Sequence, residues 1–305
     1  MILDIKRVSK LDAPTCILGE SPMWHSGRKQ AFWVDILGDT ITAYNLDDGL
    51  VKQYDGAQLI SLVCQVEGNN ELLVAGARGG VGFYNLESHE LSLISDLNRS
   101  WENHRCNDGT VDRLGNLWVG STHMDHEPGA GDLYCVSDAW RVSKKIEQVS
   151  ISNGMCWSAD NETMYHIDSP TREIKAFKHN AITGDITFDR VAVQIPASLG
   201  FPDGMAMDAK GTVWVAIWGG SGVGGYNALT GQLEHWIPIP APNVSSCAFV
   251  GPELDCLLIT TARKEMDEKQ LARYPDSGQT FVVKMEVPGL PTYNCRLPII
   301  KSGNE

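Results

Sequence analysis

Hydrophobic positions along the chain follow one pattern that recurs six times. Each copy has a short apolar run, a polar turn that usually carries Gly, Asn or Asp, and a second run of β-branched, aromatic or aliphatic residues. Such short alternating runs have the period of half-buried β-strands, and no run shows a sustained helical period. The copies are spaced by roughly 45 residues, the length of one propeller blade. Equivalent positions in the second runs are Trp33, Leu73, Trp118, Tyr165, Trp214 and Leu258.

Most copies continue with a third alternating run, beginning for example at Ile41 or Val223, and with a weaker fourth run, as at Val51 or His235. Four short strands in each of six repeats predict an all-β fold, a six-bladed β-propeller. A doubly wound fold would instead need helices of about 10 to 15 residues between the strands. We expect a single domain over residues 1–305, in which a strand near Ile5 joins the last blade and removes its unpaired edge.

The first strand of each blade lines the central channel of a propeller, so the residue just before it should stand at one mouth of that channel. Carboxylate and amide oxygens at this position suit Ca²⁺, Mg²⁺ or Mn²⁺, and Zn²⁺ also accepts carboxylates. A divalent cation would offset the repulsion between clustered acids. Asn-Gly and Asp-Gly are also ordinary turn dipeptides, but their recurrence at equivalent positions favours a site. In blade order the positions hold Glu20, the stretch Leu59 to Ser61, Asn107 with Asp108, Asn153, Asp203, and Ser245 with Ser246.

The charge balance excludes some classes of partner. The chain has 25 Lys and Arg against 38 Asp and Glu, a net charge of −13, so it lacks the basic surface that nucleic acids and anionic membranes require. No apolar run is long enough to span a membrane, and the first residues do not resemble a secretory signal, so we expect a cytoplasmic protein. The eight cysteines include no C-x-x-C pair and indicate buried thiols rather than a zinc ribbon or a disulfide framework.

Two further features lie near the predicted mouth. Arg105 precedes Asn107 by two residues and could hold substrate hydroxyls or a developing oxyanion, although a surface ion pair would use the same residue. The loop after the third hairpin contains His123 and His126, whose spacing alone does not make a zinc site, so we interpret it as a solvated loop. No G-x-S-x-G elbow is present, which disfavours a serine nucleophile.

Several segments, taken together and in order, resemble the senescence-marker protein/gluconolactonase/luciferin-regenerating-enzyme-like family, and the regucalcin-type lactonases within it most of all. The segments are LGESPMW at Leu18, FWVDI at Phe32, NDGTVD at Asn107, ISNGMCWS at Ile151, YHIDS at Tyr165, FPDGMAMDAKGTVWVA at Phe201 and SSCAF at Ser245. The resemblance implies a six-bladed propeller that binds one divalent metal ion. We expect this ion to be Ca²⁺, with Zn²⁺, Mg²⁺ or Mn²⁺ as alternatives.

By motif, the family's metal ligands correspond to Glu20, Asn153 and Asp203, which agrees with the set reached from the repeat. Family substrate contacts correspond to Arg105 and Asn107, and a further acid aligns with Asp125, with Glu127 two residues on as the alternative. The sequence GSTHMD departs from the family pattern before that acid, which puts substrate preference in doubt. KEMDEKQ in the last blade departs from a more glycine-containing pattern and is expected to form a surface loop.

The predicted function is that of a gluconolactonase-like enzyme of carbohydrate metabolism, which hydrolyses a small-molecule sugar lactone such as gluconolactone. The metal ion would polarise the ester carbonyl, and Asp203 would activate water as the general base. Three alternatives stay open: a regucalcin-like calcium-binding regulator without turnover, a hydrolase of other esters or phosphoesters, and a scaffold for a protein partner. A scaffold has no need of a Glu, Asn and Asp set, which argues against the last.

Overall fold

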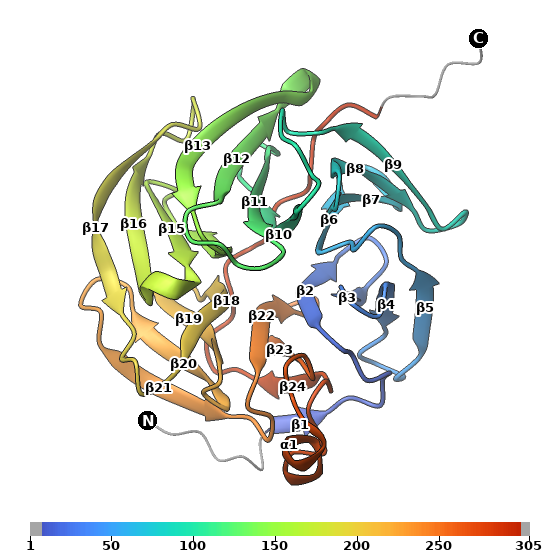
Figure 1. The fold of residues 1–305 in the computed structure, drawn as a ribbon, viewed down its shortest axis with the longest axis vertical. Helices are drawn as coiled ribbons and strands as arrows, with labels where there is room; N and C mark the ends of the chain where they lie inside the picture. The colour runs from blue at the N-terminus through green and yellow to red at the C-terminus, as the bar shows by residue number, and fades with distance from the viewer. Residues whose placement is uncertain (1–7, 300–305) are drawn as a thin grey trace.

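The computed structural model describes residues 8–299, which form six four-stranded antiparallel sheets around a central axis (Figure 1). This arrangement confirms the six-bladed propeller. Blade 1 contains β2 (Gly19–His25), β3 (Gln30–Asp35), β4 (Thr40–Tyr44) and β5 (Val51–Asp55), and blade 2 contains β6 (Leu62–Val66), β7 (Asn69–Ala77), β8 (Gly80–Asn85) and β9 (Glu90–Ser95). Blade 3 contains β10 (His104–Val111), β11 (Leu117–His123), β12 (Gly131–Ser137) and β13 (Arg141–Val149), with the 3₁₀ turn η2 (Asp138–Trp140).

Blade 4 contains β14 (Ser152–Trp157), β15 (Thr163–Asp168), β16 (Glu173–His179) and β17 (Ile186–Gln194), with the 3₁₀ turn η3 (Ser169–Thr171). Blade 5 contains β18 (Phe201–Met207), β19 (Thr212–Trp218), β20 (Gly222–Asn227) and β21 (Leu233–Pro238). Blade 6 contains β22 (Val244–Val250), β23 (Cys256–Thr261), β24 (Phe281–Lys284) and β1 (Val8–Lys10). The inner strands β2, β6, β10, β14, β18 and β22 surround the channel.

Both ends of the chain contribute to blade 6. Strand β1 pairs antiparallel with β24, with Val8 opposite Val283 and Lys10 opposite Phe281. The ring is therefore closed by backbone hydrogen bonds between segments from opposite ends of the chain, and the outer edge of β24 is paired. Ile5, named in the predicted closing strand, lies outside the described residues.

Each pair of adjacent blades encloses its own apolar cluster, because both faces of a blade carry alternating hydrophobic residues. Between blades 6 and 1, for example, Leu258 packs with Trp33 and Tyr44. Between blades 3 and 4, Trp118 packs with Trp157. All six equivalent positions of the repeat are less than a tenth exposed. The repeat seen in the sequence thus corresponds to the packing between blades.

Two hairpins show how the local sequence fixes a blade. In blade 3, the carboxylate of Asp112 accepts hydrogen bonds from the backbone of Leu114 and Asn116 and from the indole of Trp118. Asp208 makes the same contact with the indole of Trp214 in blade 5, at 3.0 Å. One buried carboxylate therefore joins the turn between the first two strands to the core aromatic of the second strand.

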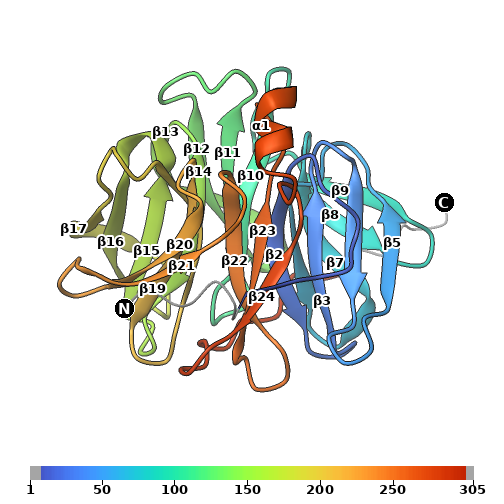
Figure 2. The ribbon, with the colours of Figure 1, turned by 90° about the horizontal axis from the view of Figure 1, so that it is seen from below.

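One α-helix departs from the all-strand expectation within residues 8–299. Helix α1 (Glu268–Arg273) lies in the segment between β23 and β24 and stands on one face of the disc (Figure 2). Asp267 caps it, since its side chain accepts from the Gln270 backbone while the Gln270 side chain accepts from the Asp267 backbone. A helix of six residues is too short for its period to be visible in the sequence.

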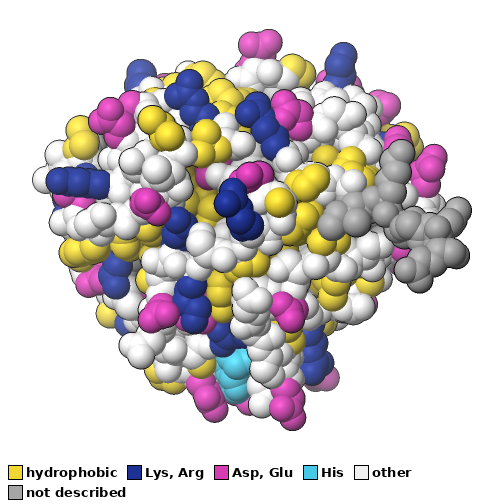
Figure 3. Space-filling model, turned by 90° about the horizontal axis from the view of Figure 1, so that it is seen from above, with side chains coloured by type: hydrophobic (Ala, Val, Ile, Leu, Met, Phe, Trp, Pro, Cys, Tyr) yellow, Lys and Arg dark blue, Asp and Glu magenta, His cyan; other side chains and the backbone are white. Residues whose placement is uncertain are grey.

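The surface carries charged side chains of both signs (Figure 3). On the face drawn in Figure 3, basic and acidic side chains are interspersed, and the basic ones do not gather into a single stripe. No helix in the described part of the chain is long and apolar enough to cross a membrane. All eight cysteines are free thiols, and all but Cys156 and Cys256 are buried.

Candidate functional site

Five of the six inner strands carry a β-bulge in their N-terminal half. A bulge leaves a residue unpaired and changes the direction in which its side chain points. In β6 the register shifts at the opposite end, beside Val66, and no residue of β6 lines the cavity described below. The bulged strands direct polar side chains into the channel; the bulges lie at or next to Glu20, Asn107, Asn153 and Asp203.

The glycines that follow these polar residues belong to the bulges, not to turns before the strands. A Cβ on Gly154 would lie 2.6 Å from the backbone oxygen of Asp203, and one on Gly204 would collide with the side chain of Ser246. Neighbouring inner strands therefore approach so closely around the channel that only glycine fits. The turn interpretation of the Asn-Gly and Asp-Gly pairs is wrong at these two positions.

Carboxylates at the ends of two second strands hold the segments that lead into the site. Asp35 accepts from the backbone N–H groups of Ile17 and Leu18, at 2.7 and 2.9 Å, just before Glu20. Asp168 does the same for Ile151, at 3.0 Å, just before Asn153. These charge-assisted bonds fix the path of the backbone immediately ahead of two predicted ligands.

A chain of side-chain amides crosses from blade 3 to blade 4. The Asn107 amide nitrogen donates to Oδ1 of Asn153 at 3.0 Å and to the backbone oxygen of Ser152 at 2.8 Å. The amide nitrogen of Asn153 donates to the hydroxyl of Ser169 at 2.8 Å, and this hydroxyl donates to the Pro202 carbonyl. These contacts orient the Asn153 amide, so that its oxygen lies toward Asn107 and its nitrogen toward η3.

Arg105 is buried beside the hydrogen-bonded amides of Asn107 and Asn153. One of its guanidinium nitrogens donates to Oδ1 of Asn107 at 2.7 Å and to the backbone oxygen of Cys106 at 2.9 Å. Burial lowers the pKa of the guanidinium, and the nearby Glu20 opposes this effect. An arginine remains charged in proteins, so Arg105 supplies a fixed positive charge and further N–H donors next to the acids.

Three acids from three different blades line the channel, and of these Asp203 is buried while Glu20 and Asp108 are partly buried. Burial, followed by the charge of Asp108, raises the pKa of Glu20 to about 8. Burial, followed by Glu20 and Asp108, raises the pKa of Asp203 well above its ordinary value, while Arg105 and Lys264 oppose the rise. Burial raises the pKa of Asp108 to about 6. Ionising all three acids together is therefore unfavourable unless a further positive charge is present.

The donor set fits a hard divalent cation. Among residues 8–299, the buried Oδ1 of Asp203 has no hydrogen-bond partner, and the Glu20 carboxylate accepts one hydrogen bond, from the Ser21 backbone at 3.4 Å. Within residues 8–299 no group of three or more His, Cys, Asp or Glu side chains is arranged to hold a metal ion. A cation here would therefore need the oriented amide oxygen of Asn153 beside the two carboxylates, an all-oxygen set.

These residues line a cavity of about 380 Å³, which we call the site cavity. Its volume lies within the range of roughly 300 to 1,000 Å³ that is typical of small-molecule sites. Phe201 and Trp218, which are opposite each other on β18 and β19, supply an aromatic wall. Such a wall can pack against the apolar face of a sugar ring. The lining also includes Glu20, Arg105, Asn107, Asn153 and Asp203.

The loop between β11 and β12 contains Asp125 and Glu127, the two acids expected as alternatives for a substrate contact. Asp125 is exposed and does not line the site cavity, and Glu127 is also exposed. A tight turn, in which the His126 N–H donates to the His123 carbonyl at 3.0 Å, brings His126 to the cavity instead. The ring of His123 packs against His104, with centroids 4.9 Å apart, so the two histidines do not converge.

The segment KEMDEKQ contributes to the site, which corrects the surface-loop expectation. Lys264 and Glu265 both line the site cavity, and helix α1 begins only after them. Of the other expected mouth residues, Asp108 and Ser246 line a second cavity. Sequence reasoning therefore missed Lys264, His126 and the aromatic wall.

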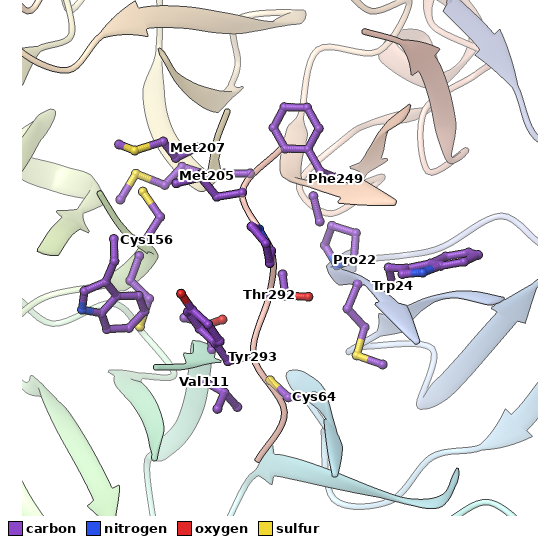
Figure 4. Close-up of a pocket in the computed structure, with 18 of the residues that line it drawn as sticks. Pro22, Trp24, Cys64, Val111, Cys156, Met205, Met207, Phe249, Thr292 and Tyr293 are labelled. Atoms are coloured by element: carbon purple, nitrogen blue, oxygen red, sulfur yellow. The ribbon is translucent and has the colours of Figure 1, made fainter. Parts of the chain in front are cut away.

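The second cavity lies further along the same inner strands and has a volume of about 180 Å³. Figure 4 shows Met205, Met207 and Cys156 pointing into it from neighbouring blades, with Thr292 and Tyr293 on a segment that crosses it. We call it the tail cavity because this C-terminal segment lines it. The segment is anchored by backbone bonds from Leu290 to Met207 and from Cys295 to Gln65.

The fold is a six-bladed propeller in which residues of five blades line one polar cavity, the site cavity. Residues 18–263 match the model of the SMP-30/Gluconolactonase/LRE-like region. The chain therefore belongs to the SMP-30/gluconolactonase/LRE-like family, as the sequence motifs predict.

Individual relatives agree with this assignment. The chain is 31% identical to the Bacillus subtilis protein named "Putative sugar lactone lactonase YvrE" over 280 residues, covering 92% of this chain and 95% of that protein. It is 30% identical to regucalcin of Danio rerio, covering 91% and 94%. Among solved structures, a calcium-binding protein, regucalcin, of Agrobacterium tumefaciens superposes with a TM-score of 0.89 at 28% identity, covering 94% of this chain and 97% of that one.

Proposed function

We propose that this chain is a divalent-metal-dependent lactonase that hydrolyses sugar-acid lactones such as gluconolactone. The observation that carries the proposal is the convergence of Glu20, Asn153 and Asp203 from three blades on one cavity, with an oxygen of Asp203 buried and unpartnered. Membership in a family that includes gluconolactonases supports the reaction class.

Glu20, Asn153 and Asp203 would hold the cation, for which Ca²⁺ is our first choice and Zn²⁺, Mg²⁺ or Mn²⁺ the alternatives. When bound, the cation supplies Lewis-acid polarisation of the lactone carbonyl. Arg105 and Asn107 line the cavity beside these ligands and orient the hydroxyls of the sugar. The aromatic wall of Phe201 and Trp218 packs against the ring and excludes water from its far side.

Asp203 is the general base. It accepts a proton from the attacking water as the water oxygen bonds to the carbonyl carbon, and the proton then goes to the ring oxygen when the acyl C–O bond breaks. The product is the open-chain hydroxy acid. This role requires an ionised carboxylate, so it depends on the positive charges around Asp203, which in the chain are Arg105 and Lys264.

A regucalcin-like protein that binds calcium without turnover is the second candidate. The all-oxygen donor set favours it equally, and the 28%-identical structure is described as a calcium-binding protein. A hydrolase of other esters or phosphoesters would use similar groups. We further propose a single-domain protein of sugar-acid metabolism located in the cytoplasm.

Proton release from D-glucono-1,5-lactone and several aldono-1,4-lactones tests the proposal. The protein is first treated with a chelator, and Ca²⁺, Mg²⁺, Mn²⁺ or Zn²⁺ is then added back singly. Hydrolysis well above the spontaneous rate, lost on chelation and restored by a metal, is the expected result. If no lactone is hydrolysed with any metal, the lactonase proposal is overturned, and calcium binding alone would favour the regulator.

A further inference from the structure

A lysine whose positive charge favours the ionised form of Asp203 also lies at the mouth of the site cavity. Lys264 follows β23 by three residues, and its backbone is fixed on both sides. Its N–H donates to the Ile17 carbonyl at 3.0 Å, and its carbonyl accepts from the Asn243 side chain at 3.1 Å. The stem of the side chain therefore starts from a defined point, and about a quarter of the side chain is exposed.

The ammonium group of Lys264 is joined to a second nitrogen group from another blade. Its Nζ lies 3.2 Å from Nε2 of His126, which comes from the loop between β11 and β12. Burial, followed by Lys264, lowers the pKa of His126, so the neutral ring accepts the hydrogen bond at Nε2 and carries its proton on Nδ1. Nδ1 is buried and has no hydrogen-bond partner in the described part of the chain. The pair thus offers an unused ring donor beside a positive charge.

The neighbouring acid does not neutralise this pair. Glu265 lies 3.4 Å from Nζ of Lys264, but 60% of its side chain is exposed. Exposed ion pairs of this kind contribute little, because water screens them and both side chains lose freedom. An ammonium has three donors, and the contacts to His126 and Glu265 occupy two of them. Lys264 therefore retains the capacity to bind an incoming anion.

The arrangement of charges divides the site cavity into two parts. Glu20, Asn153 and Asp203 provide the oxygen set, while Lys264 and His126 provide nitrogen donors from the loops at the mouth. A neutral aldonolactone would leave the ammonium of Lys264 with the exposed Glu265 as its direct anionic contact. A lactone with an exocyclic carboxylate or phosphate would supply that partner through charge-assisted hydrogen bonds.

We propose that Lys264 and His126 form an anion subsite, and that the preferred substrates are sugar lactones that carry an exocyclic anionic group. This inference rests on the proposed lactonase function and specifies its substrate class. Lys264 is a specificity-determining residue in this account, because it contacts the anionic end of the substrate and takes no part in proton transfer.

The test compares kcat/KM for D-glucono-1,5-lactone, a glucarolactone and 6-phosphogluconolactone in the metal-loaded protein. We expect kcat/KM for the better anionic lactone to exceed kcat/KM for the neutral lactone at least about tenfold. Lys264→Met should reduce this ratio of the two kcat/KM values by about tenfold or more, mainly by raising KM for the anionic lactone. Lys264→Arg should restore part of the ratio. Lys269→Met, which removes an exposed charge from helix α1 outside the cavity, is the matched control and should leave the ratio unchanged. The preferred anionic lactone identifies carboxylate or phosphate as the recognised group.

Three outcomes are decisive. If the neutral lactone is preferred, or if Lys264→Met leaves the ratio unchanged in a protein that still unfolds cooperatively, the subsite is refuted while the lactonase proposal stands. If no lactone is hydrolysed, the lactonase proposal fails, and the subsite is tested by calorimetric titration with glucarate and gluconate. Tighter binding of glucarate that is lost in Lys264→Met supports the subsite, and equal binding of the two acids overturns it.

Discussion

The site cavity and the tail cavity are lined by the same inner strands but differ in chemistry. At the first, strands β2, β14 and β18 present Glu20, Asn153 and Asp203. A few residues further along, β14 and β18 present Met155 and Met205. The difference follows the bulges, because they lie at the site end of the strands and turn polar side chains inward there.

The two cavities also differ in what covers them. The segment with Lys264 and the loop with His126 approach the site cavity from blades 6 and 3 and meet each other there. The tail cavity is crossed by the C-terminal segment, whose Leu297 is buried in the apolar cluster between blades 2 and 3. One end of the channel thus presents polar side chains, and the other is crossed by a segment that packs into the core.

The largest contrast should come from single residues of β18. Asp203→Asn removes the proposed base and one carboxylate ligand, so we expect lactone turnover to fall by about 10³-fold or more. Met207→Leu, four residues along the same strand in the tail cavity, keeps volume and apolarity and should change turnover less than about twofold. Steady-state hydrolysis with added metal measures both, and near wild-type rates in Asp203→Asn would refute the role of this residue.

A substitution in the C-terminal segment should instead lower the stability of the protein and leave its turnover unchanged. Leu297 is 3% exposed, so Leu297→Ala should lower the free energy of unfolding by about 2 to 5 kcal/mol while leaving kcat unchanged below the unfolding transition. Ile299→Ala, at a position 44% exposed, is the control and should cost less than about 1 kcal/mol. Denaturant unfolding checks both variants. Equal stability of the two would contradict the anchoring role of the segment.

The smallest effect concerns the far end of β2, which begins near Glu20 and ends at His25. Burial, followed by Arg28, lowers the pKa of His25 to about 4, and Nδ1 accepts from the Arg28 backbone at 3.2 Å. The unfolded chain binds this proton first, so stability should fall as the pH decreases from about 6.5 to 4, by at most roughly 3 kcal/mol. In His25→Asn this part of the pH dependence should disappear. Parallel stability profiles for the two proteins would show that the His25 proton is not linked to folding.

The blades were predictable because each repeat carries its own hydrophobic period. Trp33 and Trp118, for example, occupy the same packing position in two different copies. The bulges were not predictable, because a dipeptide such as Asn153-Gly154 suits a turn as well as a bulge. Which loop residue enters the site depends on one turn, and this turn selects His126 over Asp125. Lys264 was missed because its position depends on backbone hydrogen bonds from Arg263 and Lys264 to Ile17, which no local sequence pattern reveals.

The central claim is that the site end of the channel binds one divalent cation through residues from three blades. Calorimetric titration of Ca²⁺ and Mn²⁺ into the chelator-treated protein and into Asn153→Leu tests it most directly. We predict one site per chain in the wild-type protein and at least about tenfold weaker binding in the variant, which removes the amide oxygen and keeps both carboxylates. Absence of binding in the wild-type protein, or equal binding in the variant, would contradict the account.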